Sequence, residues 1–152
     1  MKPKIVIDTS VVIEYLDRSG AWHRFATAIF DSIIQGKVIA YIPVIALSEI
    51  LYISKRLYEK IGKANPKRKA IKLLRWLYRN PNIIIVRGGL RLAVLSGLIK
   101  SKYRLALSDC YVLALAKLLK AKPIFRKRER EMLDYIDTLR KIYNAVFLED
   151  YQ

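Results

Sequence analysis

The sequence contains one cysteine and one histidine, Cys110 and His23. A single cysteine excludes a disulfide bond within the chain, and one Cys with one His is too few to build a zinc site of the usual kind. Cys110 lies in an apolar helical pattern, where a packing role is expected. His23 stands alone, and no catalytic role is assigned to it. Chemistry at a functional site is therefore expected from other side chains.

Acidic residues are also scarce, because 13 Asp and Glu stand against 29 Lys and Arg, giving a formal net charge of +16. Such a surplus favours a polyanionic partner, with nucleic acid as the leading candidate. Two alternatives are a basic surface that is merely solvated and an acidic protein partner. Because acids are few, each one that lies beside apolar sequence is informative.

Long apolar runs are missing as well. The run between Lys4 and Asp8 is Ile-Val-Ile, which is too short for a signal peptide or a membrane span. This predicts a soluble, cytoplasmic protein with no membrane partner. The 6 Gly and 5 Pro are scattered and mark no linker, while 53% of the residues are hydrophobic. We therefore expect a single domain that spans residues 1–152.

Hydrophobic periodicity and turn residues predict strands that alternate with helices. The predicted strands are Lys4–Ile7, Val38–Ile42, Asn82–Val86, Pro123–Phe125 and Ala145–Leu148. The predicted helices are Val11–Leu16 (capped by Thr9 and Ser10), Ala21–Gln35, Val44–Ile61, Pro66–Arg79 (capped by Asn65), Leu90–Lys100, Leu107–Lys120 and Glu129–Ile142. This alternation indicates the α/β class, as an α/β/α sandwich with a central, mainly parallel five-stranded sheet. Ligands of such sheets bind beyond the carboxyl ends of the strands.

Three acids stand out by their positions. Asp8 directly follows the first strand, Glu49 interrupts an otherwise nearly apolar helical stretch, and Asp109 opens an apolar helix. Each also has an ordinary explanation. Asp8 and Asp109 can serve as helix caps or compensate a helix dipole, and Glu49 can lie on a solvent-exposed stripe.

Taken together, the three acids suggest a metal site. Carboxylates from separate elements that converge at one strand edge repel one another unless a hard cation lies among them. Mg²⁺ and Mn²⁺ prefer oxygen ligands, and they support phosphodiester hydrolysis without His or Cys. The convergence itself is an inference from the predicted fold.

The same residues resemble a known family. Residues 5–14, IVIDTSVVIE, are similar to the opening of PIN domains, particularly those of VapC-type toxins from toxin–antitoxin pairs. Residues 43–50, PVIALSEI, and 107–116, LSDCYVLALA, resemble the second and third motifs of that family, in the family's order. The resemblance covers essentially the whole chain. It implies a PIN-like parallel sheet and an endoribonuclease site with Asp8, Glu49 and Asp109 as metal ligands. It also implies that Ser10 steadies the first acid.

One motif departs from the family pattern. After the fourth strand the family often has Thr-x-Asp, whereas this chain continues from Phe125 as RKRERE. Glu129 is the nearest acid and the predicted fourth catalytic residue, with Glu131 and Asp134 as alternatives. The alternative role of Glu129 is to favour the start of its helix.

Two basic clusters accompany these acids. The first comprises Lys63, Lys67, Arg68, Lys69, Lys72, Arg75 and Arg79, and the second surrounds Arg126, Lys127 and Arg128. The second lies beside the proposed fourth acid, so Arg126, Lys127 and Arg128 are candidate RNA-binding residues. Solvated helix faces would explain many of these cations equally well. The apolar stripe that includes Trp76 indicates packing, or a groove for an antitoxin helix.

The predicted function is a Mg²⁺- or Mn²⁺-dependent endoribonuclease that hydrolyses RNA, as the toxin of a type II toxin–antitoxin pair. Its implied partners are RNA, an antitoxin protein and a second copy of the chain in a homodimer. Two alternatives remain open at this point. One is a non-catalytic PIN-like RNA-binding or scaffold module, and the other is an RNA-processing nuclease outside toxin–antitoxin systems.

Overall fold

A parallel sheet forms the centre of the molecule, whose structure is a computed structural model describing residues 1–151. The strands are β1 (Lys4–Ile7), β2 (Ile39–Pro43), β3 (Ile83–Val86), β4 (Lys122–Phe125) and β5 (Val146–Phe147). They are ordered β3-β2-β1-β4-β5, and every neighbouring pair is parallel. Short, β-branched sequences suit such strands because both faces of a parallel sheet are covered. The predicted five-stranded α/β/α sandwich is confirmed.

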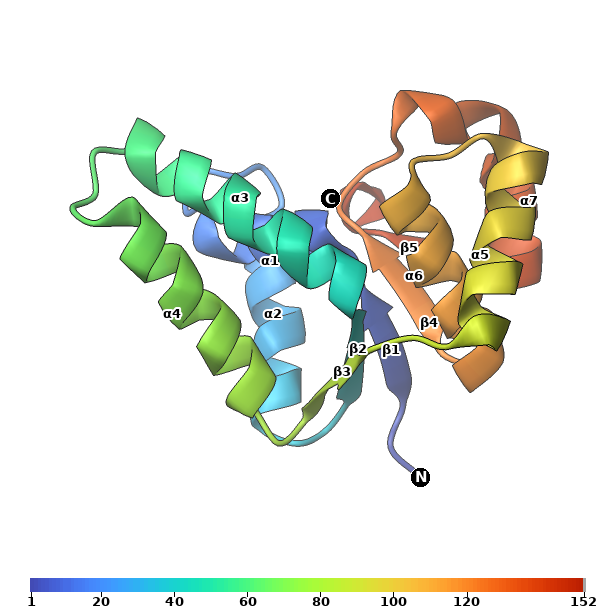
Figure 1. Ribbon diagram of the computed structural model, residues 1–152, viewed down its shortest axis with the longest axis horizontal. Coiled ribbons are helices and arrows are strands. Elements are labelled where there is room, and N and C mark those ends of the chain that lie inside the picture. Colours follow the sequence, from blue (N-terminus) through green and yellow to red (C-terminus); the bar gives the residue numbers. More distant parts are fainter. Residues whose placement is uncertain (152) are drawn as a thin grey trace.

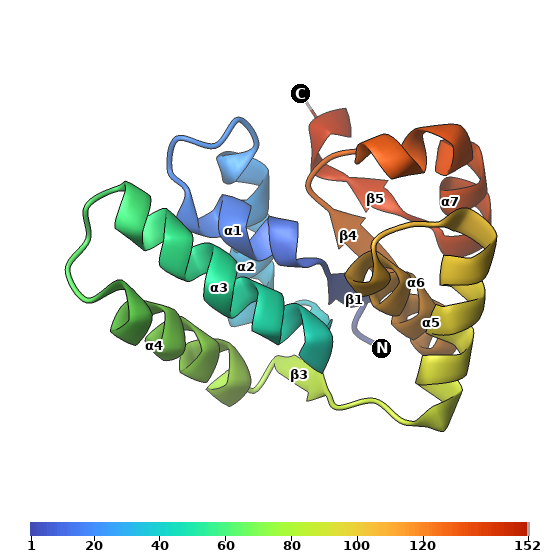
Figure 2. The same ribbon diagram turned by 45° about the horizontal axis from the view of Figure 1, so that its top comes forward.

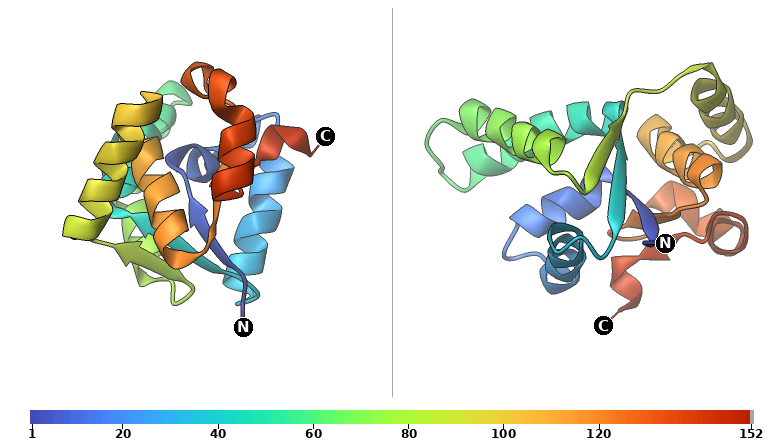
Figure 3. Two further views of the ribbon diagram at one scale, coloured as in Figure 1. Left: turned by 90° about the vertical axis from the view of Figure 1, so that its right-hand side faces the viewer. Right: turned by 90° about the horizontal axis from the view of Figure 1, so that it is seen from below.

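Helices cover both faces of this sheet (Figures 1 and 2). They are α1 (Thr9–Leu16), α2 (His23–Ile34), α3 (Val44–Lys60), α4 (Pro66–Arg79), α5 (Leu90–Tyr103), α6 (Leu107–Leu119) and α7 (Ile136–Tyr143). Figure 3 shows α1 to α4 on one side of the strands and α5 to α7 on the other. No helix among residues 1–151 is both long and apolar enough to cross a membrane.

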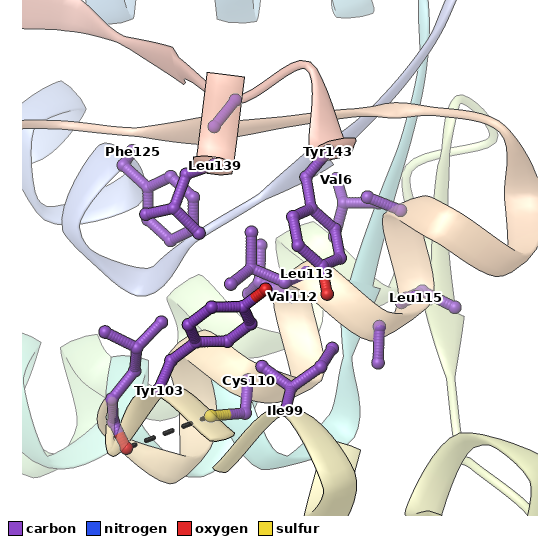
Figure 4. Close-up of a cluster of buried hydrophobic side chains, with 14 of the residues drawn as sticks. Val6, Ile99, Tyr103, Cys110, Val112, Leu113, Leu115, Phe125, Leu139 and Tyr143 are labelled. Carbon is purple, nitrogen blue, oxygen red and sulfur yellow. Dashed lines mark hydrogen bonds between the residues drawn. The ribbon is translucent and has the colours of Figure 1, made fainter. Parts of the chain in front are cut away.

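Two hydrophobic cores result, one on each face. Successive side chains of β1 point to opposite faces, so Val6 joins one core and Ile7 the other. Figure 4 shows the Val6 core, where Tyr103 and Cys110 pack beneath α7. Cys110 is buried, and burial raises the pKa of its thiol to about 11. The thiol is therefore a packing group, as predicted, and a poor nucleophile at neutral pH.

Several boundaries differ from those predicted. Thr9 and Ser10 do not cap α1, because Asp8 is the N-cap and its side chain accepts a hydrogen bond from the Ser10 amide. Helix α2 begins at His23 rather than Ala21, and α5 continues to Tyr103. Asn65 does precede α4 but has a left-handed conformation with φ 52° and makes no side-chain cap.

The predicted helix Glu129–Ile142 is divided in two. Residues Arg130–Tyr135 form a 3₁₀ helix, and α7 begins only at Ile136. In a 3₁₀ helix, residues three apart eclipse each other, which places Met132 and Tyr135 on one side. Met132 is fully buried there, and the ring of Tyr135 meets Tyr103 edge-on at 4.9 Å between centroids. This packing explains why the apolar spacing resembled that of a continuous α-helix.

The order of the strands places a binding crevice beside β1. The chain passes from β1 to β2 and β3 on one side, then returns to β4 and β5 on the other. All strands stay parallel, but the side on which the chain adds new strands changes between β1 and β4. Such a switch point leaves an open crevice at the carboxyl ends of its two strands. In this chain those ends carry Asp8 and Arg126.

Candidate metal and nucleic-acid site

A cavity of about 380 Å³ occupies that crevice. Acids from four separate segments line it, namely Asp8, Glu49, Asp109 and Glu129. Glu131 lines it too, whereas Asp134 is not among its lining residues. The structure thus brings together all four acids that the sequence singled out, although the first and the last are 121 positions apart in the chain.

Asp8 is held rigidly at the end of β1. Its Oδ2 accepts hydrogen bonds from the Ser10 amide at 3.0 Å and from the Ser10 hydroxyl at 2.5 Å. The Ser10 Oγ in turn accepts a hydrogen bond of 3.2 Å from the backbone N–H of Arg126. One hydroxyl therefore joins the ends of β1 and β4. Asp8 thus acts as a helix cap, and it also lines the cavity.

Glu49 reaches the cavity from the first half of α3. The Thr9 hydroxyl lies 3.3 Å from Glu49 Oε1 and 3.3 Å from the Ala46 carbonyl oxygen, so its proton can serve either acceptor. This contact joins α1 to α3 beside the acids. Sequence reasoning treated Thr9 only as a cap, and nothing local in the sequence reveals a contact across 40 positions.

Asp109 lies in the first turn of α6 and is 9% exposed. Burial, then the charges of Asp8, Glu49 and Glu129, raise the pKa of Asp109 to about 9. Burial also raises the pKa of Asp8, although the hydrogen bonds from Ser10 oppose that rise. Repulsion from the neighbouring Asp8 carboxylate therefore adds to the effect of burial at Asp109. The cavity therefore holds more negative charge than it can stabilise alone.

This donor set fits a hard divalent cation. Carboxylate and hydroxyl oxygens are the ligands that Mg²⁺ and Mn²⁺ prefer, and a cation would relieve the repulsion that raises these pKa values. Within residues 1–151 no three His, Cys, Asp or Glu side chains are yet close enough to hold a metal ion as they stand. The acids instead surround the cavity.

The predicted basic residues divide into two groups. Arg126 and Lys127 line the cavity, where their charges can face a phosphate. Arg128 does not line it, because its guanidinium donates to Glu149 Oε1 at 2.8 Å and to Asp150 Oδ1 at 2.5 Å. These acids follow β5 at the end of the chain, and they orient Arg128 toward the C-terminal segment rather than the cavity.

Glu14 is an acid that sequence reasoning missed. It is 2% exposed, and its Oε2 lies 3.5 Å from Arg126 Nη1. Its Oε1 accepts a 2.8 Å hydrogen bond from the Trp22 amide, and the loop must pass close by, since a Cβ on Gly20 would lie 2.2 Å from that oxygen. Glu14 therefore anchors the inner side of Arg126. The available signal was an acid at the end of the apolar run Val-Val-Ile.

Comparison with known proteins agrees with this architecture. The model of the PIN domain family matches residues 5–135. A toxin–antitoxin complex from Klebsiella pneumoniae superposes with a TM-score of 0.61 at 18% identity, over 95% of this chain and 97% of that chain. VapBC2 from Rickettsia felis, bound to a promoter DNA fragment, gives 0.61 at 11% identity, over 95% and 96%.

A third solved structure is VapC20 from Mycobacterium tuberculosis, described as a toxin that cleaves the sarcin-ricin loop. It gives a TM-score of 0.61 at 13% identity, over 78% of this chain and 86% of that chain. At these identities the likeness shows the fold. No curated protein matches the sequence significantly.

Proposed function

The chain belongs to the PIN domain family, and from that premise we propose that it is a divalent-metal-dependent endoribonuclease acting as the toxin of a toxin–antitoxin pair. The observation that carries the proposal is the gathering of Asp8, Glu49, Asp109 and Glu129 around one cavity at the switch point of the sheet. The strongly raised pKa of Asp109 supports it, because such shifts concentrate at functional sites. The protein would meet its RNA substrate and its antitoxin partner in the cytoplasm.

The residues of the cavity divide the work. Asp8, Glu49 and Asp109 would hold the cation, and Ser10 keeps the Asp8 carboxylate in one orientation. Arg126 and Lys127 would bind the phosphate group of the phosphodiester bond that is cleaved. Glu14 holds Arg126 in place. When bound, a divalent cation supplies Lewis-acid activation of the phosphodiester and lowers the pKa of attacking water. Glu129, which also lines the cavity, would orient that water or complete the cation site.

The experiment that tests this function is removal of the metal. Purified protein is expected to cleave RNA with Mn²⁺ or Mg²⁺, to lose cleavage in EDTA and to regain it when the metal is restored. Titration calorimetry should show Mn²⁺ binding in the same range of concentrations. RNA that binds without being cut, together with no Mn²⁺ binding, would instead identify a non-catalytic RNA-binding module.

The antitoxin partner is proposed from the neighbours, since one is described as a toxin–antitoxin complex and another as a VapBC pair. A protein that stays active when co-expressed with the product of any adjacent small reading frame would instead be an RNA-processing nuclease.

An apolar face on α5 supports the proposed homodimer. Leu90, Val94 and Leu98 are 82%, 52% and 62% exposed and follow one another at intervals of four residues. They line a groove that also contains Leu118 of α6. Gly97 lies on the same face, with no atom within 4 Å of an added Cβ, so a partner helix could approach closely. Exposed apolar rows of this kind mark interaction surfaces.

We expect the double substitution Val94→Glu and Leu98→Glu to convert a dimer into a monomer. Two carboxylates placed in an apolar interface would each lose hydration on association, which outweighs the contact energy. Light scattering coupled to gel filtration measures the change as a halving of the molar mass. The matched control is the double substitution Ile34→Glu and Ile61→Glu, at positions 50% and 54% exposed outside this groove, and it should leave the mass unchanged. A wild-type chain that is already monomeric would contradict this interface.

A further inference from the structure

Every charged side chain of helix α4 is positive. Its sequence, PKRKAIKLLRWLYR, contains six Lys or Arg and no acid. Four of the six, Arg68, Lys72, Arg75 and Arg79, recur at intervals of four, three and four residues, which places them on one face of the helix. All four are exposed, and we call this row the α4 stripe.

Packing of the opposite face fixes the direction of the stripe. Ala70, Leu73 and Leu77 are buried, and α4 packs mainly along α3. Trp76 sets the rotation further, because its ring lies 6.4 Å from that of Tyr15 and 6.0 Å from that of Phe30. In Figure 1 the α3–α4 hairpin forms one outer edge of the molecule. The stripe therefore faces outward from a rigid element.

A groove of about 860 Å³ follows the stripe. All four stripe cations line it, together with Ile71 and Trp76. This groove lies on a different helix from any that contributes to the acidic cavity, and the two share no lining residue. The groove is thus a positively charged surface separate from the acidic cavity.

These charges have no counterpart within the described chain. No stripe cation forms an ion pair with any of residues 1–151. Like charges at i and i+4 destabilise a helix, and cations in its first turn oppose the helix dipole. The chain therefore retains an arrangement that weakens α4. An external polyanion would remove that penalty.

We propose that the α4 stripe binds the sugar–phosphate backbone of RNA outside the cleavage cavity. The stripe extends from Arg68 to Arg79, and at 1.5 Å per residue its two ends lie roughly 16 Å apart along the helix axis. One strand of double-stranded DNA advances about 3.4 Å per phosphate, and on that scale the length of the stripe corresponds to four or five phosphates. Three of the four cations are Arg, whose planar donors match phosphate oxygens. The inference rests on the proposed ribonuclease function for the identity of the polyanion.

RNA fits this surface better than an acidic protein does. A protein interface gains most from apolar anchors at its centre, with charges at the rim. Here the charges form the central row, and the groove's aromatic residue, Trp76, is only 38% exposed. A partner protein would need a run of acids at helical spacing to match four cations, whereas every RNA backbone supplies that charge density.

The test compares two variants with the same change in charge. The stripe variant is Arg68→Gln, Lys72→Gln, Arg75→Gln and Arg79→Gln. The control replaces Lys37, Arg104, Lys122 and Lys141 with Gln, four exposed cations elsewhere. A labelled 20-nucleotide RNA is titrated by fluorescence anisotropy in EDTA, which separates binding from cleavage. The salt concentration is varied from 50 to 200 mM.

The stripe variant should lose about three units of the slope of log K against log salt, since each phosphate on single-stranded RNA contributes about 0.7. Its affinity at 100 mM salt should fall at least about tenfold by the same relation. The control should keep its slope within about one unit. Both variants should melt close to wild type, because exposed substitutions rarely change stability much.

Equal slopes for the stripe variant and wild type would overturn the proposal. So would an unchanged RNA affinity accompanied by lost binding to a poly-glutamate peptide, which would assign the stripe to an acidic protein. A different result would reject the proposed ribonuclease function alone. If wild type binds RNA through the stripe but cuts none with Mn²⁺, the surface stands and the ribonuclease assignment does not.

Discussion

Asp8→Asn is expected to reduce metal-dependent RNA cleavage by about a thousandfold or more. Loss of a residue that only orients a metal ligand costs about 10- to 100-fold, and loss of a proposed ligand should exceed that. An Asn amide removes the negative charge that would bind the cation. It retains an oxygen that accepts from the Ser10 amide, and Asn is among the best N-cap residues, so α1 should still form.

This design separates chemistry from folding. Cleavage is measured at saturating Mn²⁺, and circular dichroism verifies that the variant keeps the helix content of wild type. Asp31→Asn, an exposed acid on α2, is the matched control and should retain full activity. Full activity of Asp8→Asn would remove the proposed mechanism.

The metal-free protein should become less stable as the pH rises from about 5 to 8, and Asp109→Asn should abolish most of that loss. The folded chain holds the pKa of Asp109 at about 9, against an ordinary value of 3.8. Between those values the folded state binds a proton that the unfolded state releases. The stabilising effect is therefore complete below pH 3.8 and disappears as the pH approaches 9.

One proton of difference changes the free energy of unfolding by about 1.4 kcal/mol per pH unit, so about 4 kcal/mol over three units is the upper limit. Chemical denaturation in EDTA at each pH measures it. The comparison is the difference between wild type and variant, because the high net charge also changes with pH. Asp137→Asn, an exposed acid of α7, should reproduce the wild-type curve. Parallel curves for Asp109→Asn and wild type would contradict the expected proton uptake.

The part of the site that sequence reasoning predicted depends on a general rule. Asp8 directly follows a short apolar strand, and carboxyl ends of parallel strands meet at one edge, so its place in a crevice followed from position alone. Asp109 and Glu49 were recognisable because acids within apolar helical sequence need a polar environment. Their convergence was inferred from the predicted fold, whereas Glu129 was chosen as the acid nearest to the family's fourth motif.

The rest depended on contacts between distant positions. The pair formed by Glu14 and Arg126 joins residues 112 positions apart, and no local pattern indicates it. Arg128 was predicted beside RNA because its neighbours in sequence are basic. Its orientation is decided instead by Glu149 and Asp150, which return to it from the end of the chain. Charge alone could not distinguish these two arginines.

The pairing of β1 with β4 has a consequence for synthesis of the protein on the ribosome. Ile5 pairs with Lys122 and Val6 with Pro123. The second strand that pairs with β1 is therefore synthesised only after most of the chain. Arg126, Lys127 and Glu129 emerge later still. A partly translated chain can assemble the β1–β2 half of the sheet but lacks one wall of the crevice. The proposed ribonuclease site is therefore incomplete until the segment that carries Glu129 has been translated.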